Sequence, residues 1–369
     1  MTDMVSLDDL RSRQGGTTPI GTRAFVCSLA GTSLTAFERA YLRDMQPWGV
    51  ILFARNVDSP RQVKQLTTSV RQELGWHAPI LIDQEGGRVQ RLKPPHWRRY
   101  PPAATFGEIE ADHPGRGVEA AQIAAWMMAH ELLSVGVDVN CTPVLDVRFP
   151  GTTDAIGDRS FHTDRQIVAT LGRAVHDAFL NAGVVPVIKH VLGHGRAVLD
   201  SHFSLPHIAE SMGVLEQSDF FPFRALADAP LAMTGHLVFE AIDEERPATL
   251  SRAVIDVLRN DIGFSGALVS DDLAMAALDG SMADRARMAI EAGCDLALHC
   301  TGKQNEMDAL RDAVPLLEGV SAERCASALL RRGHQSHDQV GLAARLDVLL
   351  AGGPSEEDHA DPTEYGRTG

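Results

Sequence analysis

The sequence has no long hydrophobic run. No apolar stretch approaches the roughly 18 consecutive residues that mark a membrane-spanning helix. The first residues, MTDMVSLDDLRSRQGG, are polar and acidic and contain no apolar segment of a secretory signal. We therefore expect a cytoplasmic protein without a membrane partner.

Basic residues and cysteines are also scarce. The 34 Lys and Arg residues face 49 Asp and Glu residues, so the net charge is −15, which argues against a nucleic-acid partner. The five cysteines are scattered, form no CxxC pair and mostly lie in or beside apolar runs. This pattern is typical of cysteines that are buried and unpaired in a protein of a reducing compartment.

Several catalytic signatures are missing as well. The chain has no GxGxxG after its first strand-like run, no HExxH and no GxSxG. These absences argue against a dinucleotide site, a zincin-type zinc site and a serine nucleophile, respectively. We therefore expect neither a cofactor nor a resident metal ion.

Short apolar runs alternate with longer amphipathic segments along the chain. Val-, Ile- and Leu-rich runs of this kind are typical of strands that are buried on both faces. We predict strands at Ala24–Leu29, Gly49–Phe53, Pro79–Ile82, Val137–Leu145, Val184–Ile188, Leu231–Thr234, Ala267–Val269 and Leu296–His299. Helices are predicted at Ser59–Leu74, Gly117–Val135, Asp164–Asn181 and Met282–Ala292.

Eight strands with helices between them predict a single-domain α/β protein with a (β/α)8 TIM barrel. A doubly wound open sheet is the alternative. We expect an N-terminal extension at 1–21, the barrel at 22–350 and a flexible, polar C-terminal tail at 351–369, because the last segment is rich in Gly, Pro and charge.

Polar residues follow the predicted strands at the ends where a barrel carries its active site. Asp83, Gln84 and Glu85 follow the third strand, and Asp146, Lys189-His190, His236 and Asp271-Asp272 follow the next four. A barrel without a function would have little reason to concentrate such residues at one rim.

The stretch KHVLGHGRAVLDSHFSLP, residues 189–206, combines several acid-base groups in a Gly-containing loop. His190 and His194 have the spacing of metal ligands on a helix, but Gly193 and Gly195 disfavour a helix there. Asp200 can orient His202 and raise its pKa, as in the last two members of a catalytic triad. An ordinary solvated histidine is the alternative for His202.

Three other segments carry candidate site residues. Asp271 is a candidate nucleophile, with a helix cap as the alternative. Asp83 can accept hydrogen bonds from ligand hydroxyls, or it can stabilise a turn with Arg88. In the loop GDRSF, Arg159 can fork onto a substrate oxygen, bind a carboxylate or simply be solvated.

Together these motifs resemble glycoside hydrolase family 3, in particular its single-domain bacterial β-N-acetylglucosaminidases. The resemblance extends over about residues 22–335 and rests on IDQEGGRVQRL, GDRSF, KHxxGHGxxxxDSHxxLP and LRNDIGFSGALVSDDLAM, in this order. It implies a retaining β-N-acetylhexosaminidase that removes terminal β-GlcNAc from muropeptides, notably GlcNAc-1,6-anhydro-MurNAc peptides, in peptidoglycan recycling. A monomer acting on a soluble carbohydrate is expected.

The resemblance also implies roles for individual residues. Asp271 would be the nucleophile, and His202, assisted by Asp200, the general acid/base. Sugar binding would fall to the residues that match the family's substrate-binding motifs, namely Asp83, Arg91, Arg159, Lys189 and His190.

The chain departs from the family at two places. Val191-Leu192 stands where KHFPGHG has Phe-Pro, and Ala274 where the subgroup often has Ser. The first change puts loop rigidity and rate in question rather than the reaction. Three alternatives remain open: a metal-dependent barrel hydrolase using His190, His194 and Asp271, a catalytically silent sugar-binding protein, and a β-glucosidase of the same family.

Overall fold

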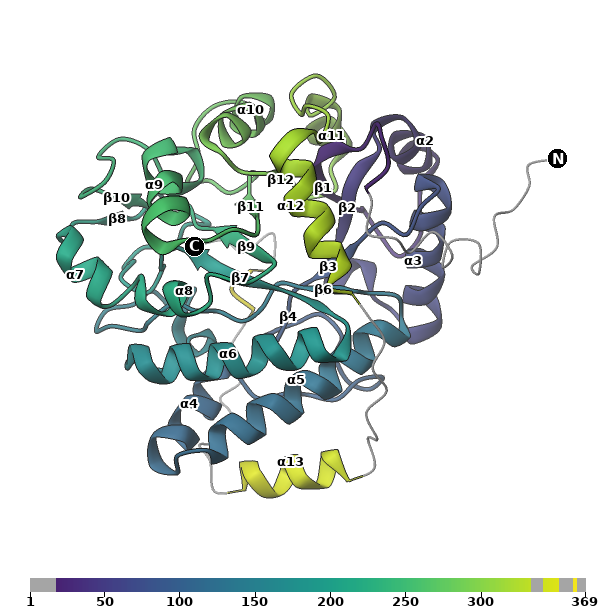
Figure 1. The fold of residues 1–369 in the computed structure, drawn as a ribbon. Coiled ribbons are helices and arrows are strands. Elements are labelled where there is room, and N and C mark those ends of the chain that lie inside the picture. The colour runs from purple at the N-terminus through teal and green to yellow at the C-terminus, as the bar shows by residue number, and fades with distance from the viewer. Residues whose placement is uncertain (1–17, 333–340, 352–360, 364–369) are drawn as a thin grey trace.

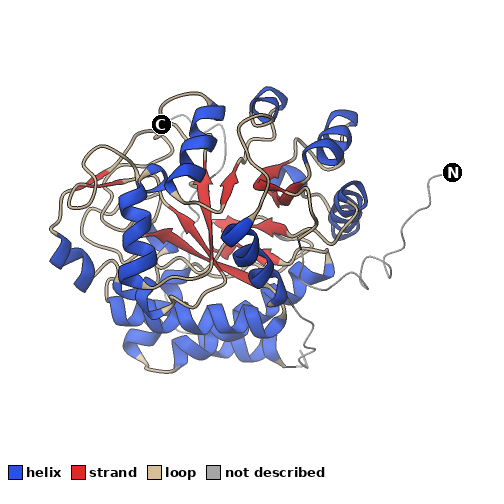
Figure 2. Ribbon diagram, turned by 45° about the horizontal axis from the view of Figure 1, so that its top comes forward, coloured by secondary structure: helices blue, strands red, loops and turns tan. Residues whose placement is uncertain are grey.

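The computed structural model describes residues 18–332, 341–351 and 361–363. Eight parallel strands close into a barrel in the order β1-β12-β11-β9-β7-β6-β3-β2. Helices surround the strands in both views (Figures 1 and 2). The strands are β1 (Arg23–Ser28), β2 (Pro47–Leu52), β3 (Ile80–Ile82), β6 (Val139–Asn140), β7 (Val185–Val191), β9 (Leu231–Thr234), β11 (Ala267–Asp272) and β12 (Leu296–Leu298).

Each predicted strand is present, and closure of the barrel rules out the open doubly wound sheet. Two strands extend further than predicted at their carboxyl-terminal ends. β7 continues to Val191 and β11 to Asp272, so Lys189, His190 and Asp271 are themselves strand residues. β6 is shorter than predicted, and after it only Val144 bridges to Lys189. The polar residues thus stand directly on the barrel's carboxyl-terminal rim.

The helices lie between the strands and on the outside of the barrel. The four predicted helices form within one or two residues of their predicted bounds. The helices are α2 (Ala36–Met45), α3 (Pro60–Leu74), α4 (Ala103–Asp112), α5 (Arg116–Ser134), α6 (Arg165–Ala182), α7 (Met212–Gln217), α8 (Phe221–Ala225), α9 (Arg252–Asp256), α10 (Met282–Ala292), α11 (Gln304–Ala309), α12 (Gly319–Leu330) and α13 (Leu342–Leu350).

Helix α3 shows how the sequence sets its own boundaries. The Ser59 hydroxyl accepts a hydrogen bond from the N–H of Gln62 at 3.4 Å, and Pro60 occupies the first turn, where its missing N–H costs nothing. Gly75 ends the helix with φ 74°, a left-handed conformation that favours glycine. Ser281 caps α10 in the same way, accepting from the N–H of Asp284.

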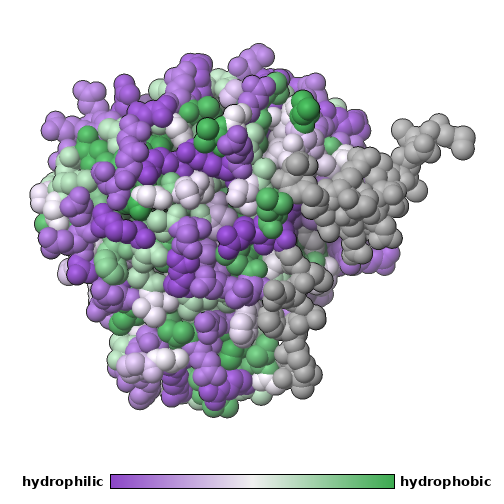
Figure 3. Space-filling view, in the orientation of Figure 1, coloured by the Kyte–Doolittle hydropathy of each residue, from purple (hydrophilic) through white to green (hydrophobic). Residues whose placement is uncertain are grey.

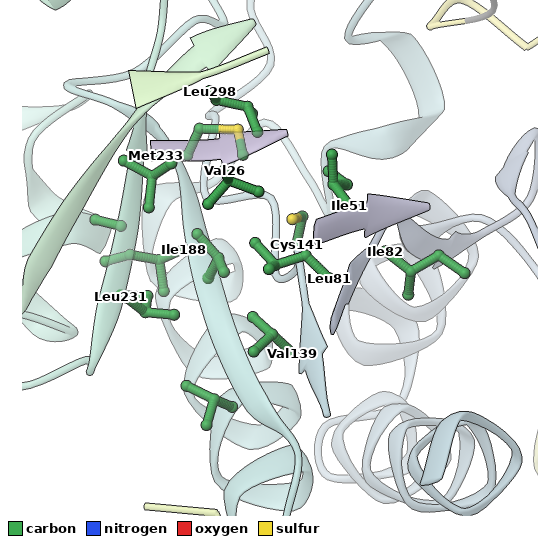
Figure 4. Packing of buried hydrophobic residues seen from close by; sticks show 14 of the residues in the cluster. Val26, Ile51, Leu81, Ile82, Val139, Cys141, Ile188, Leu231, Met233 and Leu298 are labelled. Carbon is green, nitrogen blue, oxygen red and sulfur yellow. The ribbon is translucent and has the colours of Figure 1, made fainter. Parts of the chain in front are cut away.

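The barrel interior is filled with apolar side chains. Figure 4 shows Val26, Ile51, Leu81, Val139 and Ile188 among those that meet between the strands. All five belong to one large buried cluster. The five cysteines are buried and unpaired, as the sequence predicts. The core therefore makes the barrel a rigid support for groups at its rim.

Two short strand pairs lie outside the barrel sheet. β4 (Gln84–Gly86) and β5 (Val89–Gln90) form an antiparallel hairpin directly after β3. β8 (His207–Ile208) pairs in parallel with β10 (Val238–Phe239). Both pairs shape the loops that follow barrel strands.

Helix α13 packs on the barrel's outer helices, beside α5 at the bottom of Figure 1. Arg345 pairs with Glu119 on α5 at 2.7 Å, and Arg116 donates to the carbonyl oxygen of Leu349 at 2.9 Å. Of the predicted extension, only residues 18–21 lie within the described part of the chain.

Three residues of the expected flexible tail, Asp361–Thr363, are described by the structure. They lie against the barrel, where Asp361 forms an ion pair with Arg91. The rest of the predicted tail, apart from Ala351, lies outside the described residues.

The face shown in Figure 3 is mostly hydrophilic, with apolar residues scattered among charged ones. Among the described helices, none combines the length and apolarity needed to cross a bilayer.

Candidate active site

A cavity opens at the carboxyl-terminal ends of the barrel strands. Its volume is about 60 Å³, and its lining residues include Asp83, Lys189, His190, His202 and Asp271. Residues from the ends of three different strands, β3, β7 and β11, thus meet in one cavity.

Lys189 lines the cavity and pairs with two carboxylates. Its Nζ lies 2.8 Å from Oδ1 of Asp83 and 2.7 Å from Oε1 of Glu85, and its side chain is only 3% exposed. Burial alone would lower the pKa of Lys189, but the two carboxylates outweigh burial and raise it. Lys189 is thus held as a permanent cation that can donate to sugar hydroxyls.

Glu85 forms the second centre of this network. Nε and Nη2 of Arg159 both donate to its carboxylate at 2.8 Å, a bidentate pair that fixes the guanidinium plane. Burial would raise the pKa of Glu85, but Arg159 and Lys189 lower it to about 2. Of the three alternatives for Arg159, the structure shows the one in which it binds a carboxylate. Arg159 also lines the cavity.

Asp83 links Lys189 to Arg91, whose Nη2 lies 3.1 Å from its Oδ2. Burial would raise the pKa of Asp83, but Lys189 and Arg91 lower it below its usual value. Arg88 does not contact Asp83: its Nε donates to Asp158 at 2.7 Å, so the turn alternative for Asp83 and Arg88 is wrong.

The β4–β5 hairpin fixes the backbone that carries Asp83, Glu85 and Arg91. Oε1 of Gln84 accepts hydrogen bonds from the N–H groups of Arg91 and Leu92, both at 2.9 Å. Gly86 has φ 99°, and a Cβ there would lie 2.5 Å from the carbonyl oxygen of Pro101. The glycine in DQEGG is therefore required by backbone conformation and by space.

Asp146 positions the two histidines of the KHxxGHG motif. Its Oδ2 lies 2.7 Å from Nδ1 of His190, and its Oδ1 accepts from the N–H of His194 at 2.7 Å. This arrangement leaves Nε2 as the free nitrogen of His190, which lines the cavity. The role of Asp146 was visible in the sequence only as a polar residue at a strand end.

Asp271 lies at the end of β11 and lines the cavity. Its N–H donates to Oγ1 of Thr234 at 3.0 Å, and its Oδ1 accepts from the N–H of Asp272 at 2.8 Å. Burial would raise the pKa of Asp271, but His236, His190 and the Asp272 N–H lower it below its usual value. The carboxylate is therefore ionised at neutral pH, as a nucleophile must be.

His236 and Thr249 support this strand end from behind. Nε2 of His236 lies 2.9 Å from the carbonyl oxygen of Asp272, and its Nδ1 lies 2.7 Å from Oγ1 of Thr249. Thr249 also lies 2.7 Å from Oγ1 of Thr234, which holds Asp271. The nucleophile candidate thus rests on a buried, hydrogen-bonded support.

Asp200 and His202 form the expected dyad. Oδ1 of Asp200 lies 2.7 Å from Nδ1 of His202 and accepts from the His202 N–H at 2.9 Å. Burial would raise the pKa of Asp200, but the hydrogen bonds from His202 lower it. With Nδ1 bound to Asp200, Nε2 is left for proton transfer, and His202 lines the same cavity as Asp271.

Within the described residues, no group of three or more His, Cys, Asp and Glu side chains is arranged to hold a metal ion. The His190 and His194 rings lie edge to face with centroids 5.8 Å apart. His194 instead approaches the Ser201 hydroxyl with its Nε2 at 3.2 Å.

The family model for the glycosyl hydrolase family 3 N-terminal domain matches residues 26–331, which contain this cavity apart from Thr363. The chain belongs to glycosyl hydrolase family 3.

The relatives reported below are both named β-hexosaminidase. A β-hexosaminidase of Thiobacillus denitrificans is 38% identical over 356 residues, which cover 91% of this chain and 96% of the relative. One from Alkalilimnicola ehrlichii is 41% identical over 277 residues, or 74% of this chain and 79% of the relative. This family 3 member is accordingly an enzyme of the β-N-acetylhexosaminidase class.

A solved structure agrees with this membership. NagZ from Neisseria gonorrhoeae, in complex with N-trifluoroacetyl-D-glucosamine, superposes with a TM-score of 0.80 at 32% identity and covers 90% of this chain and 98% of its own. The barrel described above is therefore also the fold of a solved family member.

Proposed function

We propose that this enzyme is a retaining exo-glycosidase that removes non-reducing terminal β-GlcNAc from small peptidoglycan fragments. One observation carries the proposal: the ionised Asp271 and His202, which is paired with Asp200, line one cavity together with the charged side chains of Asp83, Arg159 and Lys189. That combination supplies a nucleophile, a proton carrier and a polyol-binding surface in one place.

In the first step, a carboxylate oxygen of Asp271 attacks the anomeric carbon and forms a covalent glycosyl ester. The bond from that carbon to the leaving oxygen breaks, and protonated His202 gives its proton to that oxygen. In the second step, neutral His202 takes a proton from water, the water oxygen attacks the anomeric carbon, and the bond to Asp271 breaks. Two inversions at one carbon give net retention.

The charged side chains of the cavity would hold the sugar. Lys189 and Arg159 have N–H groups in addition to those that pair with Asp83 and Glu85. Asp146 binds Nδ1 of His190 and not its Nε2. Hydroxyl groups bind well to such fixed donors and acceptors, since neither partner has to reorganise on binding. Arg91 would act through Asp83, which it holds from outside the cavity lining.

The resemblance of the motifs to the bacterial subgroup points to GlcNAc-1,6-anhydro-MurNAc peptides as substrates, and so to cell-wall recycling in the cytoplasm by a monomer. Hydrolysis of purified muropeptides with release of GlcNAc, measured by mass spectrometry, tests the substrate. Fractionation of the source cell and light scattering test the compartment and the monomer.

Trapping the intermediate tests the mechanism. A slowly turned-over fluorinated β-GlcNAc donor should label the enzyme, and peptide mass spectrometry should place the sugar on Asp271. NMR of the first-formed product should show the β-anomer. Labelling of another residue, or an α-configured first product, would contradict the proposed mechanism.

The sugar specificity is tested by comparing 4-nitrophenyl β-GlcNAc with 4-nitrophenyl β-glucoside. We expect kcat/KM to be larger for the N-acetylated substrate. A clear preference for the glucoside would favour the β-glucosidase alternative.

A further inference from the structure

The described residues nearest the C-terminus lie at the mouth of the barrel. Nη1 of Arg91 forms an ion pair with Oδ2 of Asp361, and Nη2 of Arg91 donates to Oγ1 of Thr363 at 2.6 Å. Arg91 and Asp361 are only 3% and 7% exposed. A segment some 270 positions away in sequence thus covers a residue of the sugar-binding motif.

This segment is also ordered internally. The N–H and the hydroxyl of Thr363 both donate to Oδ1 of Asp361, at 2.9 and 2.7 Å. Such an Asx-type turn holds the two side chains in a fixed relation. Asp361 can therefore bind Arg91 while Thr363 is presented beside it.

Thr363 lines the cavity together with Asp271 and His202, whereas Arg91 is not among the lining residues. Its hydroxyl donates to Asp361 and accepts from Arg91, which leaves one lone pair for another donor. The position facing the cavity at this edge therefore belongs to the tail hydroxyl rather than to Arg91.

Charge balance around the cavity also depends on the tail. The buried cations Lys189, Arg91 and Arg159 contact the carboxylates of Asp83 and Glu85, which leaves one positive charge in excess. Asp361 supplies the third carboxylate. An excess of buried positive charge is costly, so the tail carboxylate is integrated into the network rather than lying loosely over it.

We infer that Asp361-Pro362-Thr363 is a structural part of the sugar site. Thr363 contacts a sugar hydroxyl through its Oγ1, and Asp361 is a positioning residue that holds Arg91 and Thr363 in place. The inference deepens the proposed function and rests on it. It assigns substrate recognition to the tail of a chain whose family match ends at residue 331.

Paired substitutions test this assignment in the full-length enzyme. Thr363→Val should raise both KM for 4-nitrophenyl β-GlcNAc and the inhibition constant of free GlcNAc by about three- to tenfold, the value of one hydrogen bond. kcat should change by less than about twofold, because His202 transfers the proton and Asp271 makes the attack. Thr363→Ser keeps the hydroxyl and should restore both constants.

Two further variants complete the set. Asp361→Asn should raise the same two constants, since Arg91 loses one of its two counter-charges. Thr170→Val, at an exposed position on α6, should leave them unchanged. Removal of residues 352–369 should reproduce the effect of the tail substitutions, with the melting temperature confirming that the barrel is folded.

Unchanged constants in both Thr363→Val and the shortened chain would overturn the inference. A lower KM and higher kcat/KM in the shortened chain would also overturn it, since the segment would then block the site. Turnover of the same substrate by the wild-type enzyme tests the proposed function separately. The inference about the tail can therefore fail while the proposed function stands.

Discussion

The two halves of the candidate site are built in different ways. The half around the ends of the barrel strands is buried and multiply paired: the side chains of Lys189, Glu85 and Arg159 are 3%, 5% and 5% exposed. The half on the 198–204 loop is a single pair, with His202 and Asp200 at 27% and 18% exposure. Val198 and Phe203 beside it are 67% and 45% exposed.

This difference indicates a division of work. Groups that hold a sugar and attack it gain from being fixed in advance, because no free energy is then spent on reorganisation. A proton carrier that reaches a leaving group must let the substrate in first, which suits a loop with few anchors. The described contacts of the dyad are mostly within the loop itself, and Ser201 adds one hydrogen bond to His194.

The largest effect is expected on the strand half, from Asp271→Asn. The amide is a poor nucleophile, so kcat for 4-nitrophenyl β-GlcNAc should fall about 10⁴-fold or more while the fold is kept. Asp279→Asn, at an exposed carboxylate on the same segment, serves as the matched control and should leave kcat unchanged. Activity of the Asp271 variant within tenfold of wild type would remove Asp271 as the nucleophile.

On the loop half, His202→Ala should lower kcat/KM about 10²–10⁴-fold for a substrate with a poor leaving group. The loss should shrink for an activated aryl leaving group, and azide should restore release of the glycosyl-enzyme. His207→Ala removes an exposed imidazole paired with Glu240 at 3.2 Å and is the control. If azide has no effect and the loss is the same for all leaving groups, His202 is not the acid/base.

The two halves should also differ in their contribution to folding. Lys189→Met removes the cation that two buried carboxylates share, so the free energy of unfolding should fall by about 3–5 kcal/mol. Lys303→Met breaks an exposed pair with Glu306 and should cost less than about 1 kcal/mol. His202→Ala should resemble the exposed pair in urea denaturation. A large loss of stability in His202→Ala would contradict the division between the halves.

The smallest effect is on the pH dependence of stability. Burial lowers the pKa of His194 from 6.5 to about 4, so the unfolded chain binds its proton first and stability should fall as the pH drops through this range. Glu85, with a pKa lowered from 4.5 to about 2, should extend the loss below pH 4.5. Urea unfolding at several pH values should show a shallower slope between pH 6.5 and 4 in His194→Gln. An unchanged slope would show that His194 is not the group that titrates.

Much of the fold follows from the sequence because buried parallel strands leave a simple signal. The eight Val-, Ile- and Leu-rich runs all became barrel strands, and Ser59 and Gly75 marked the ends of α3. The errors lie at strand ends. β7 and β11 continue into polar residues because backbone pairing, not side-chain hydropathy, decides where a ladder stops.

Parts of the site could not be found in this way. Glu85 was visible only as a polar residue after β3, and its bidentate pair with Arg159 joins positions 74 residues apart. Asp146 binds a histidine 44 positions away. A motif shows which residue types are adjacent in sequence, and it contains no signal for partners that meet only when the barrel closes.

The sequence by itself determined the class of protein: a soluble-type composition, the strand-helix alternation and four ordered motifs pointed to a family 3 barrel. Only the tertiary structure decided how the charges are shared. Closure of the barrel brings Lys189 between Asp83 and Glu85, and the C-terminal segment places Asp361 on Arg91. The physical reason is that hydropathy and turn chemistry are local properties of a chain, whereas the partner of a buried charge is fixed by the path of the whole backbone.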